Sequence, residues 1–373
     1  MYTLLRFPRD VLRKRLERFQ ELLKSRGIDA AMIRVLSTYT YFTGTRWLRP
    51  SLLIPADSDP ILFAARGEED ELLNRTWITN VKTFRDGGEL MRTVSGIIRS
   101  NGYRRVGIEF GIERDAYILF YEMFKRLNPS VDVIDISDLV YGLRMVKDSY
   151  ELDSIRKAGE LAVKIMDKVL NIIKPGITET ELAAEAYHQA LRLGSEEPKV
   201  YINVGPNPRV HAEAFRDIKV SGREAVTIVL GIDYNNYYVN MSRTVLLGSS
   251  DIGSTALKCM REVYEEARRL TKPGVRPIDV MKRLDEIYSR YGLIEYRVIG
   301  YLHGVGLQVE EPPITTIVPK HRYIELSPNM AIAFIHSPIM IKGVGQIKFE
   351  DTYIVTEEGL ELVTKYELRY FSM

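Results

Sequence analysis

The feature that most constrains the fold is a pattern that occurs twice in the second half of the chain. A long apolar-periodic stretch at 149–173 stops at Lys174-Pro175-Gly176-Ile177, and another at 251–270 stops at Lys272-Pro273-Gly274-Val275. Proline cannot continue a helix, and glycine readily adopts the left-handed conformation that ends one. Each stop precedes a second helical stretch and then segments of strand length. The pattern predicts an internal duplication, two helix–helix–strand halves about a pseudo-two-fold axis with a central cleft; coincidence of two common stop signals is the alternative.

The part of the chain before these halves alternates helical and strand-like stretches. Residues 9–26 carry leucines and a phenylalanine at helical spacing and end at Gly27. The further stretches are strand-like at 29–35, 51–55, 61–65, 106–110 and 131–136, and helical at 89–99 and 114–127. Such alternation predicts an α/β domain with helices packed on a sheet. We therefore expect an α+β protein with an α/β domain at 1–143 and a second domain at 144–373.

Composition excludes several classes of protein. Hydrophobic residues make up 45% and charged residues 27% of the 373, the balance of a soluble globular protein, and the net charge of +2 does not favour a nucleic-acid partner. The single cysteine, Cys259, excludes a disulfide framework. No secretory signal is visible, and no apolar run reaches the roughly 18–20 residues of a membrane helix, so we expect a cytoplasmic protein without a membrane partner. Glutamine occurs only four times beside abundant charged residues, which predicts a thermophilic host.

Four stretches of the second domain carry residue types suited to chemistry. A Gly-Pro-Asn turn delivers His211, a predicted hairpin occupies 226–244, two glycines follow His303, and a strand carries the adjacent Glu350 and Asp351. Adjacent residues of a strand point to opposite faces, so we expect one of these two carboxylates to be solvated. Each feature taken alone is more often structural than functional.

Together and in this order, the four stretches resemble the superfamily of methionine aminopeptidases, prolidases, aminopeptidase P and creatinase. The resemblance extends over nearly the whole chain, through Tyr41-Phe42-Thr43-Gly44, Arg144-Met145-Val146-Lys147 with Glu151, Gly176-Ile177-Thr178-Glu179, Gly205-Pro206-Asn207 to His211, and Asp351-Thr352 with Thr356-Glu357-Glu358-Gly359. It implies an N-terminal creatinase/prolidase-like α/β domain, a C-terminal pita-bread domain and a homodimer. A fold hosts many activities, so the resemblance bears on the fold more than on the reaction.

The same resemblance implies five metal-ligand positions, and this chain departs from the family at three of them. The family's peptidases hold two Mn, Co or Zn ions with two Asp, one His and two Glu, because two neighbouring cations need several anionic oxygens. The matching positions are Val229, Asn240, His303, Ile335 and Glu350. Asp233 lies near but is not expected to substitute. We therefore expect no metal cofactor; a single ion held with the help of His336 is the alternative.

Three functional hypotheses follow. The first is a non-catalytic protein, a pseudoenzyme that binds a peptide or small ligand in the cleft. The second, by resemblance to creatinase, is a metal-independent hydrolase of C–N bonds, in which His211 moves a proton, Glu350 holds the water or a cationic group, and His303 and Glu311 orient it. The third is a metallo-dipeptidase with an altered site. Further ligand contacts are expected from His336, Arg243 and Glu310. Catalysis requires these groups to converge on one water-accessible pocket.

Overall fold

The structure, a computed structural model, describes residues 5–47, 49–110, 117–210, 213–248 and 250–367. The chain divides into two compact units, Met1–Arg144 and Met145–Met373. No helix within the described ranges combines the length and the apolar character needed to span a membrane.

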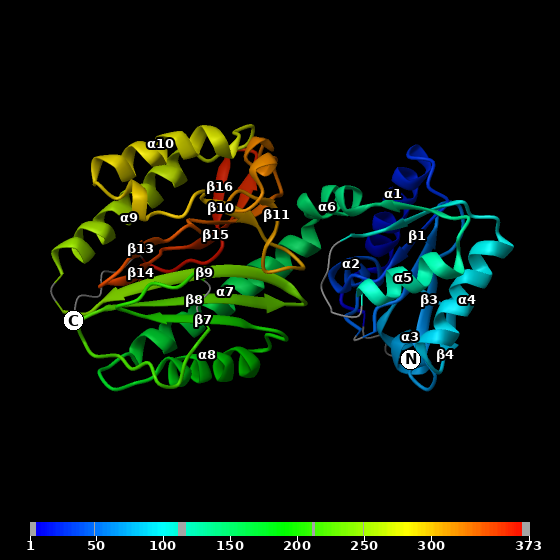
Figure 1. Ribbon diagram of the computed structural model, residues 1–373, viewed down its shortest axis with the longest axis horizontal. Coiled ribbons are helices and arrows are strands. Elements are labelled where there is room, and N and C mark those ends of the chain that lie inside the picture. The colour runs from blue at the N-terminus through cyan, green and yellow to red at the C-terminus, as the bar shows by residue number, and fades with distance from the viewer. Residues whose placement is uncertain (1–4, 48, 111–116, 211–212, 249, 368–373) are drawn as a thin grey trace. The chain divides into compact units, whose positions relative to one another are not determined.

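The first unit is built on a six-stranded sheet of order β4-β3-β2-β1-β5-β6 (Figure 1). Its strands are β1 (Ala30–Ile33), β2 (Leu52–Pro55), β3 (Ile61–Ala65), β4 (Val81–Phe84), β5 (Arg105–Ile108) and β6 (Asp132–Asp135). Its helices are α1 (Arg9–Ser25), α2 (Leu36–Thr43), α3 (Glu69–Arg75), α4 (Gly87–Ser100), α5 (Tyr117–Leu127) and α6 (Ser137–Met145). Helix α6 ends one residue into the second unit. Strand β1 is antiparallel to β2 and parallel to β5. Helices α4 and α5 share one apolar core with the sheet, through Val94, Phe120 and Phe124 packed with Met32 and Phe63.

Helix α2 is the main element of this unit that the sequence patterns missed. Its β-branched and aromatic residues favour a strand. Phe42 is fully buried, and its ring lies 4.9 Å from that of Phe19 on α1. Gly44 ends the helix with φ of 76°. Burial of the aromatic side chains against α1 therefore outweighs the intrinsic preference of the segment, which amounts to fractions of a kcal/mol per residue.

The second unit repeats one order of elements, two helices followed by strands, as the duplicated pattern predicted. The first half contains α7 (Ser149–Asn171), α8 (Glu179–Leu193), β7 (Lys199–Val204), β8 (Ala225–Tyr234) and β9 (Tyr237–Leu246). The second half contains α9 (Asp251–Leu270), α10 (Pro277–Arg290), η1 (Ile294–Tyr296), β10 (Leu302–Gly304), β11 (Glu311–Ile314), η2 (Pro319–Tyr323), β12 (Ala331–Phe334), β13 (Ile339–Ile341), β14 (Gly345–Ile347), β15 (Asp351–Thr356) and β16 (Gly359–Leu362). Gly176 and Gly274 at the two stops have φ of 92° and 81°. The predicted capping box of α8 is present, since Thr178 and Glu181 cap each other's backbone N–H groups. In Figure 1, α9 and α10 lie on one side of the strands and α8 on the other.

The strands of the second unit bring the candidate residues together. Hairpin β8–β9 turns at Asn235 and Asn236, both with positive φ, and pairs Val229 with Ser242 and Gly231 with Asn240. Because side chains alternate along a strand, Val229, Gly231 and Asn240 share one face of the hairpin. The other sheet has the order β11-β10-β12-β15-β16, and a bridge from Ser242 to Glu350 joins it to the hairpin.

The strand expected to carry Glu350 and Asp351 is divided into β14 and β15, and the expectation that one of these carboxylates is solvated is wrong. Glu350 and Asp351 are 0% and 1% exposed. They do point to opposite sides, but both sides are covered by protein. Each carboxylate has its own cationic partner, Lys348 for Glu350 and Arg243 for Asp351, and these partners make burial of both possible.

Candidate ligand-binding site

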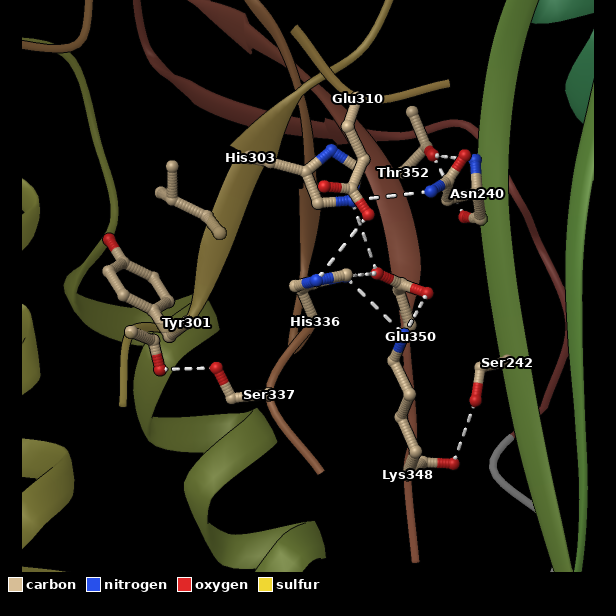
Figure 2. A network of polar contacts seen from close by, with 12 residues as sticks. Asn240, Ser242, Tyr301, His303, Glu310, His336, Ser337, Lys348, Glu350 and Thr352 are labelled. Atoms are coloured by element: carbon tan, nitrogen blue, oxygen red, sulfur yellow. Dashed lines mark hydrogen bonds and ion pairs between the residues drawn. The ribbon is translucent and has the colours of Figure 1, made fainter. Parts of the chain in front are cut away.

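A cavity of about 90 Å³ lies between strands β7–β9 and the segments that follow β10, β12 and β14. It is lined by Tyr201, Val229, Gly231, Asn240, Val309, Glu310, His336 and Lys348. The Glu310 side chain is 23% exposed, so its carboxylate stands between solvent and the buried part of the site. Figure 2 shows the polar network to which four of these lining residues belong: Asn240, Glu310, His336 and Lys348.

Glu350 is the centre of that network. One carboxylate oxygen, Oε2, lies 2.9 Å from Nζ of Lys348. The other, Oε1, lies 3.0 Å from Nδ1 of His336 and 3.5 Å from Nε2 of His303. Burial opposes ionisation, but the Lys348 charge and the two histidine hydrogen bonds outweigh it and hold the pKa of Glu350 well below its usual value. Glu350 is therefore a paired carboxylate and a weak base.

His303 lies beside Glu350 and is fully buried. Its Nδ1 is 2.8 Å from the carbonyl oxygen of Gly304, which only accepts, so Nδ1 carries the proton. Its Nε2 lies 3.2 Å from Nδ2 of Asn240 and 3.5 Å from Oε1 of Glu350. Burial lowers the pKa of His303, but its hydrogen bond with Glu350 and the charges of Glu310 and Glu350 outweigh burial and raise it. Gly304 is required here, because a Cβ on it would lie 2.5 Å from the carbonyl oxygen of Pro312.

His336 stands edge-on to His303, with ring centroids 4.5 Å apart. Its Nδ1 faces Glu350, and its Nε2 lies 3.6 Å from Oε1 of Glu310 (Figure 2). Burial, together with the positive charges of Lys348 and His303, lowers its pKa to about 4. The ring is therefore neutral at pH 7. Since a carboxylate accepts, Nδ1–H donates to Glu350, and the Nε2 lone pair is directed towards the cavity side of the ring.

We expect His336 to make the folded state lose stability as the pH falls from about 6.5 to about 4. In this window the unfolded chain, with an ordinary histidine pKa, binds a proton that the folded chain does not bind. The loss is on the order of 3 kcal/mol for a shift of this size. The raised pKa of His303 changes the stability of the folded state only above pH 6.5, outside this window. Urea unfolding at pH 6.5 and pH 4.5 measures the effect; an undiminished pH dependence in His336→Gln would contradict it.

The structure brings together four of the residues singled out from sequence, and two others, Arg243 and Glu311, do not line the cavity. His303, Glu350, His336 and Glu310 form the network. Two residues outside the cavity lining have buried ion pairs of their own: Arg243 donates to Asp351 at 3.0 Å, and Glu311 accepts from Lys147 at 2.9 Å. His211 lies outside the described residues, so its predicted catalytic role stays a prediction.

The residues at the five ligand positions do not fit a pair of divalent ions. Val229 presents a methyl surface to the cavity, and Ile335 is 0% exposed within an apolar cluster. Asn240 is uncharged. Asp233 does not substitute, because it is not among the residues that line the cavity and its Oδ1 is held by hydrogen bonds from Ser195 Oγ and two backbone N–H groups. The only carboxylate at these positions, Glu350, already pairs with an ammonium group, so two divalent cations would lack neutralising charge.

Sequence reasoning missed Lys348. Lysine is rarely buried, and a lysine on a strand is usually a solvated residue. Its place two residues before Glu350 in an extended segment was the available signal, because such residues share a face. Strand β9 holds the Lys348 backbone in place through Thr244 Oγ1, which accepts from the Lys348 N–H at 2.9 Å, and through Ser242 Oγ, which donates to its carbonyl at 3.1 Å.

Known protein families match both units of the chain. The sequence model of metallopeptidase family M24 matches residues 153–357, and that of the creatinase/prolidase N-terminal domain matches residues 15–146. An Xaa-Pro dipeptidase of Pyrococcus furiosus is 26% identical over 95% of this chain and 99% of its own length. An uncharacterized peptidase of Methanocaldococcus jannaschii is 25% identical over 96% and 97%. The crystal structure of the prolidase from Pyrococcus horikoshii OT3 matches with a TM-score of 0.85 at 25% identity, over 95% of this chain and 99% of that one. These matches confirm the expected α+β fold, a creatinase/prolidase-like domain followed by a pita-bread domain.

Proposed function

This chain belongs to metallopeptidase family M24, and from that premise we propose that it is a prolidase-like member without two-metal catalysis, whose cleft binds the ammonium end of a small ligand or short peptide. The observation that carries the proposal is the chemistry of the ligand positions. Val229, Asn240 and Ile335 bring no charge to the site, and Glu350 is paired with Lys348. Two-metal hydrolysis needs anionic oxygens between the ions, and the five ligand positions supply only one carboxylate.

The choice of an ammonium group rests on the acceptors around the cavity. Asn240 is 4% exposed, and its Oδ1 has no hydrogen-bond partner among the described residues. Nε2 of His336 and the carboxylate of Glu310 lie at the same cavity. A buried acceptor without a partner costs about 1–3 kcal/mol, and a primary ammonium carries three N–H donors. A ligand ammonium therefore satisfies Asn240 and is neutralised by Glu310.

The cavity volume limits how much of a ligand enters. About 90 Å³ is small beside the roughly 300–1,000 Å³ of pockets that enclose drug-sized ligands. An amino group and its neighbouring carbon fit this space, and the remainder of a peptide would extend past Glu310 towards solvent. This supports recognition of an N-terminus or a small amine over enclosure of a whole dipeptide.

One observation favours the alternative, a metal-independent hydrolase. His336 donates from Nδ1 to Glu350 and directs Nε2 to the cavity, the arrangement of a histidine oriented by a carboxylate to act as a general base. The lowered pKa of His336, about 4, opposes this role, because a general base works best with a pKa near the working pH. Binding without turnover therefore remains our first proposal.

The test is calorimetric titration of the protein with Xaa-Pro dipeptides and small primary amines, each paired with its N-acetylated form, alongside a search for product release. We expect binding without hydrolysis, and loss of binding on acetylation. Glu310→Gln is expected to weaken binding about tenfold, since it removes the charge that faces the ammonium. Glu358→Gln, an exposed residue of the second unit, is the matched control and should bind as the wild type does.

Two outcomes would overturn this function. Hydrolysis stimulated by added Mn²⁺ or Co²⁺ and lost in Glu350→Gln would restore the metallo-dipeptidase hypothesis. Hydrolysis without metal that is lost in His211→Ala or His336→Gln would establish the metal-independent hydrolase. Binding that is equal for free and acetylated amines would refute the ammonium as the recognised group.

A further inference from the structure

Lys348 is a buried cation at the inner end of the cavity. Its side chain is 3% exposed, and its Nζ lies 2.9 Å from Glu350 Oε2 and 3.4 Å from His336 Nδ1. Figure 2 shows the side chain running along Glu350 towards the two histidine rings. Burying an ammonium is costly unless an opposite charge compensates it, and here Glu350 provides that charge.

The groups around this ammonium form a possible donor set for a metal. Ligand atoms of His303, His336 and Glu350 all lie within 4.8 Å of one another, and all three side chains are buried. Two imidazoles and one carboxylate are the protein ligands of many one-metal zinc sites, in which water fills the fourth position. Ligand atoms of a tetrahedral site stand about 3.4 Å apart at metal–ligand distances of about 2.1 Å, so small side-chain rotations would close this set around an ion.

We propose that Lys348 is an internal cation that takes the place of a metal ion and closes a latent one-metal site formed by His303, His336 and Glu350. In this arrangement the ammonium neutralises the only carboxylate of the set. A divalent ion bound there would stand within a few ångströms of a positive charge in a poorly screened interior, which opposes its binding. The inference concerns the charge inside the network and does not depend on which ligand enters the cavity.

The test removes the ammonium and leaves the three metal-binding groups. Lys348→Met keeps the apolar stem of the side chain, and removal of its charge leaves Glu350 without its cation. Wild-type protein, freed of metal, should bind less than a tenth of an equivalent of Co²⁺ at this site. Lys348→Met should bind one equivalent at least about 100-fold more tightly, with the visible absorption of tetrahedral Co²⁺. Zn²⁺ should displace the Co²⁺ and abolish that absorption.

Two variants separate the site from other effects. Lys342→Met removes an exposed lysine from the loop between β13 and β14 and should bind no more Co²⁺ than the wild type. Lys348→Met combined with Glu350→Gln should lose the gained binding, because the carboxylate is part of the donor set.

Three results would overturn the proposal. The first is one equivalent of Co²⁺ bound to wild-type protein and lost in Glu350→Gln. The second is a folded Lys348→Met that binds no Co²⁺. The third is a Lys348→Met protein that stays insoluble even with added Zn²⁺. The proposal requires the metal to neutralise Glu350 in place of the ammonium and so to restore folding. Folding rescued by Zn²⁺ would support the proposal.

Discussion

Replacing Arg243 by methionine should lower the free energy of unfolding by about 3–5 kcal/mol, the usual cost of breaking a buried ion pair from one side. Arg243 is 2% exposed, and its Nη2 donates to both carboxylate oxygens of Asp351 at 3.0 and 3.1 Å. Its Nη1 donates to the carbonyl oxygen of Glu350 at 3.0 Å, which ties the hairpin to the segment that carries the site. Without the guanidinium, Asp351 remains buried, and the donors that the described residues then offer it are neutral, the hydroxyl groups of Tyr264 and Thr364. Urea unfolding monitored by circular dichroism measures the loss.

Two variants check that the ion pair is the cause. Arg243→Met combined with Asp351→Leu removes both charges and should recover much of the lost stability, since an uncharged pair leaves no buried carboxylate. Arg268→Met removes an exposed arginine 3.9 Å from Glu265 and should change stability by less than about 1 kcal/mol. A loss below 1 kcal/mol in Arg243→Met would show that the hairpin does not depend on this pair.

Ile335→Glu is expected to destabilise the protein by at least about 3 kcal/mol and to create no metal site, although it introduces the ligand type that the family has at this position. Ile335 is 0% exposed within the apolar cluster that contains Phe334 and Tyr353. A carboxylate there would be buried without a cation, since the nearby ammonium of Lys348 is engaged by Glu350. Thermal unfolding with and without Mn²⁺ measures both parts of this expectation.

Ile335→Leu is the matched control and should cost less than about 1.5 kcal/mol, because it conserves volume and polarity. An Ile335→Glu protein that keeps wild-type stability would contradict the packing argument. One whose melting temperature rises with Mn²⁺ would show that a single substitution restores a metal ligand, and would thus contradict the incompatibility argued from Val229, Asn240 and Lys348.

The long helices and the hairpin were predictable because their signals are local. Helix α9 matches the predicted bounds, 251–270, and α7 ends two residues before the predicted end at 173. Apolar spacing, a capping box and a Pro-Gly stop each depend on residues within one or two turns of each other. Helix α2 was missed because its helical conformation depends on packing against α1, which no local pattern encodes.

The candidate site, too, was predictable from the sequence only in part. The order of its motifs along the chain was sufficient to indicate the superfamily and to place His303, Glu350 and His336 near one cleft. The partners of the charged residues were not predictable, because each partner comes from a distant segment: Lys147 for Glu311 and Asp351 for Arg243.

By itself the sequence determined the two-part architecture, the duplicated second half and the uncharged residues at three ligand positions. These depend on residue type and spacing, which the chain carries explicitly. Only the tertiary structure decided that both Glu350 and Asp351 are buried and that a lysine neutralises Glu350. Burial of a charge is favourable only when an opposite charge is brought within a few ångströms, and folding alone determines which side chains meet at that distance.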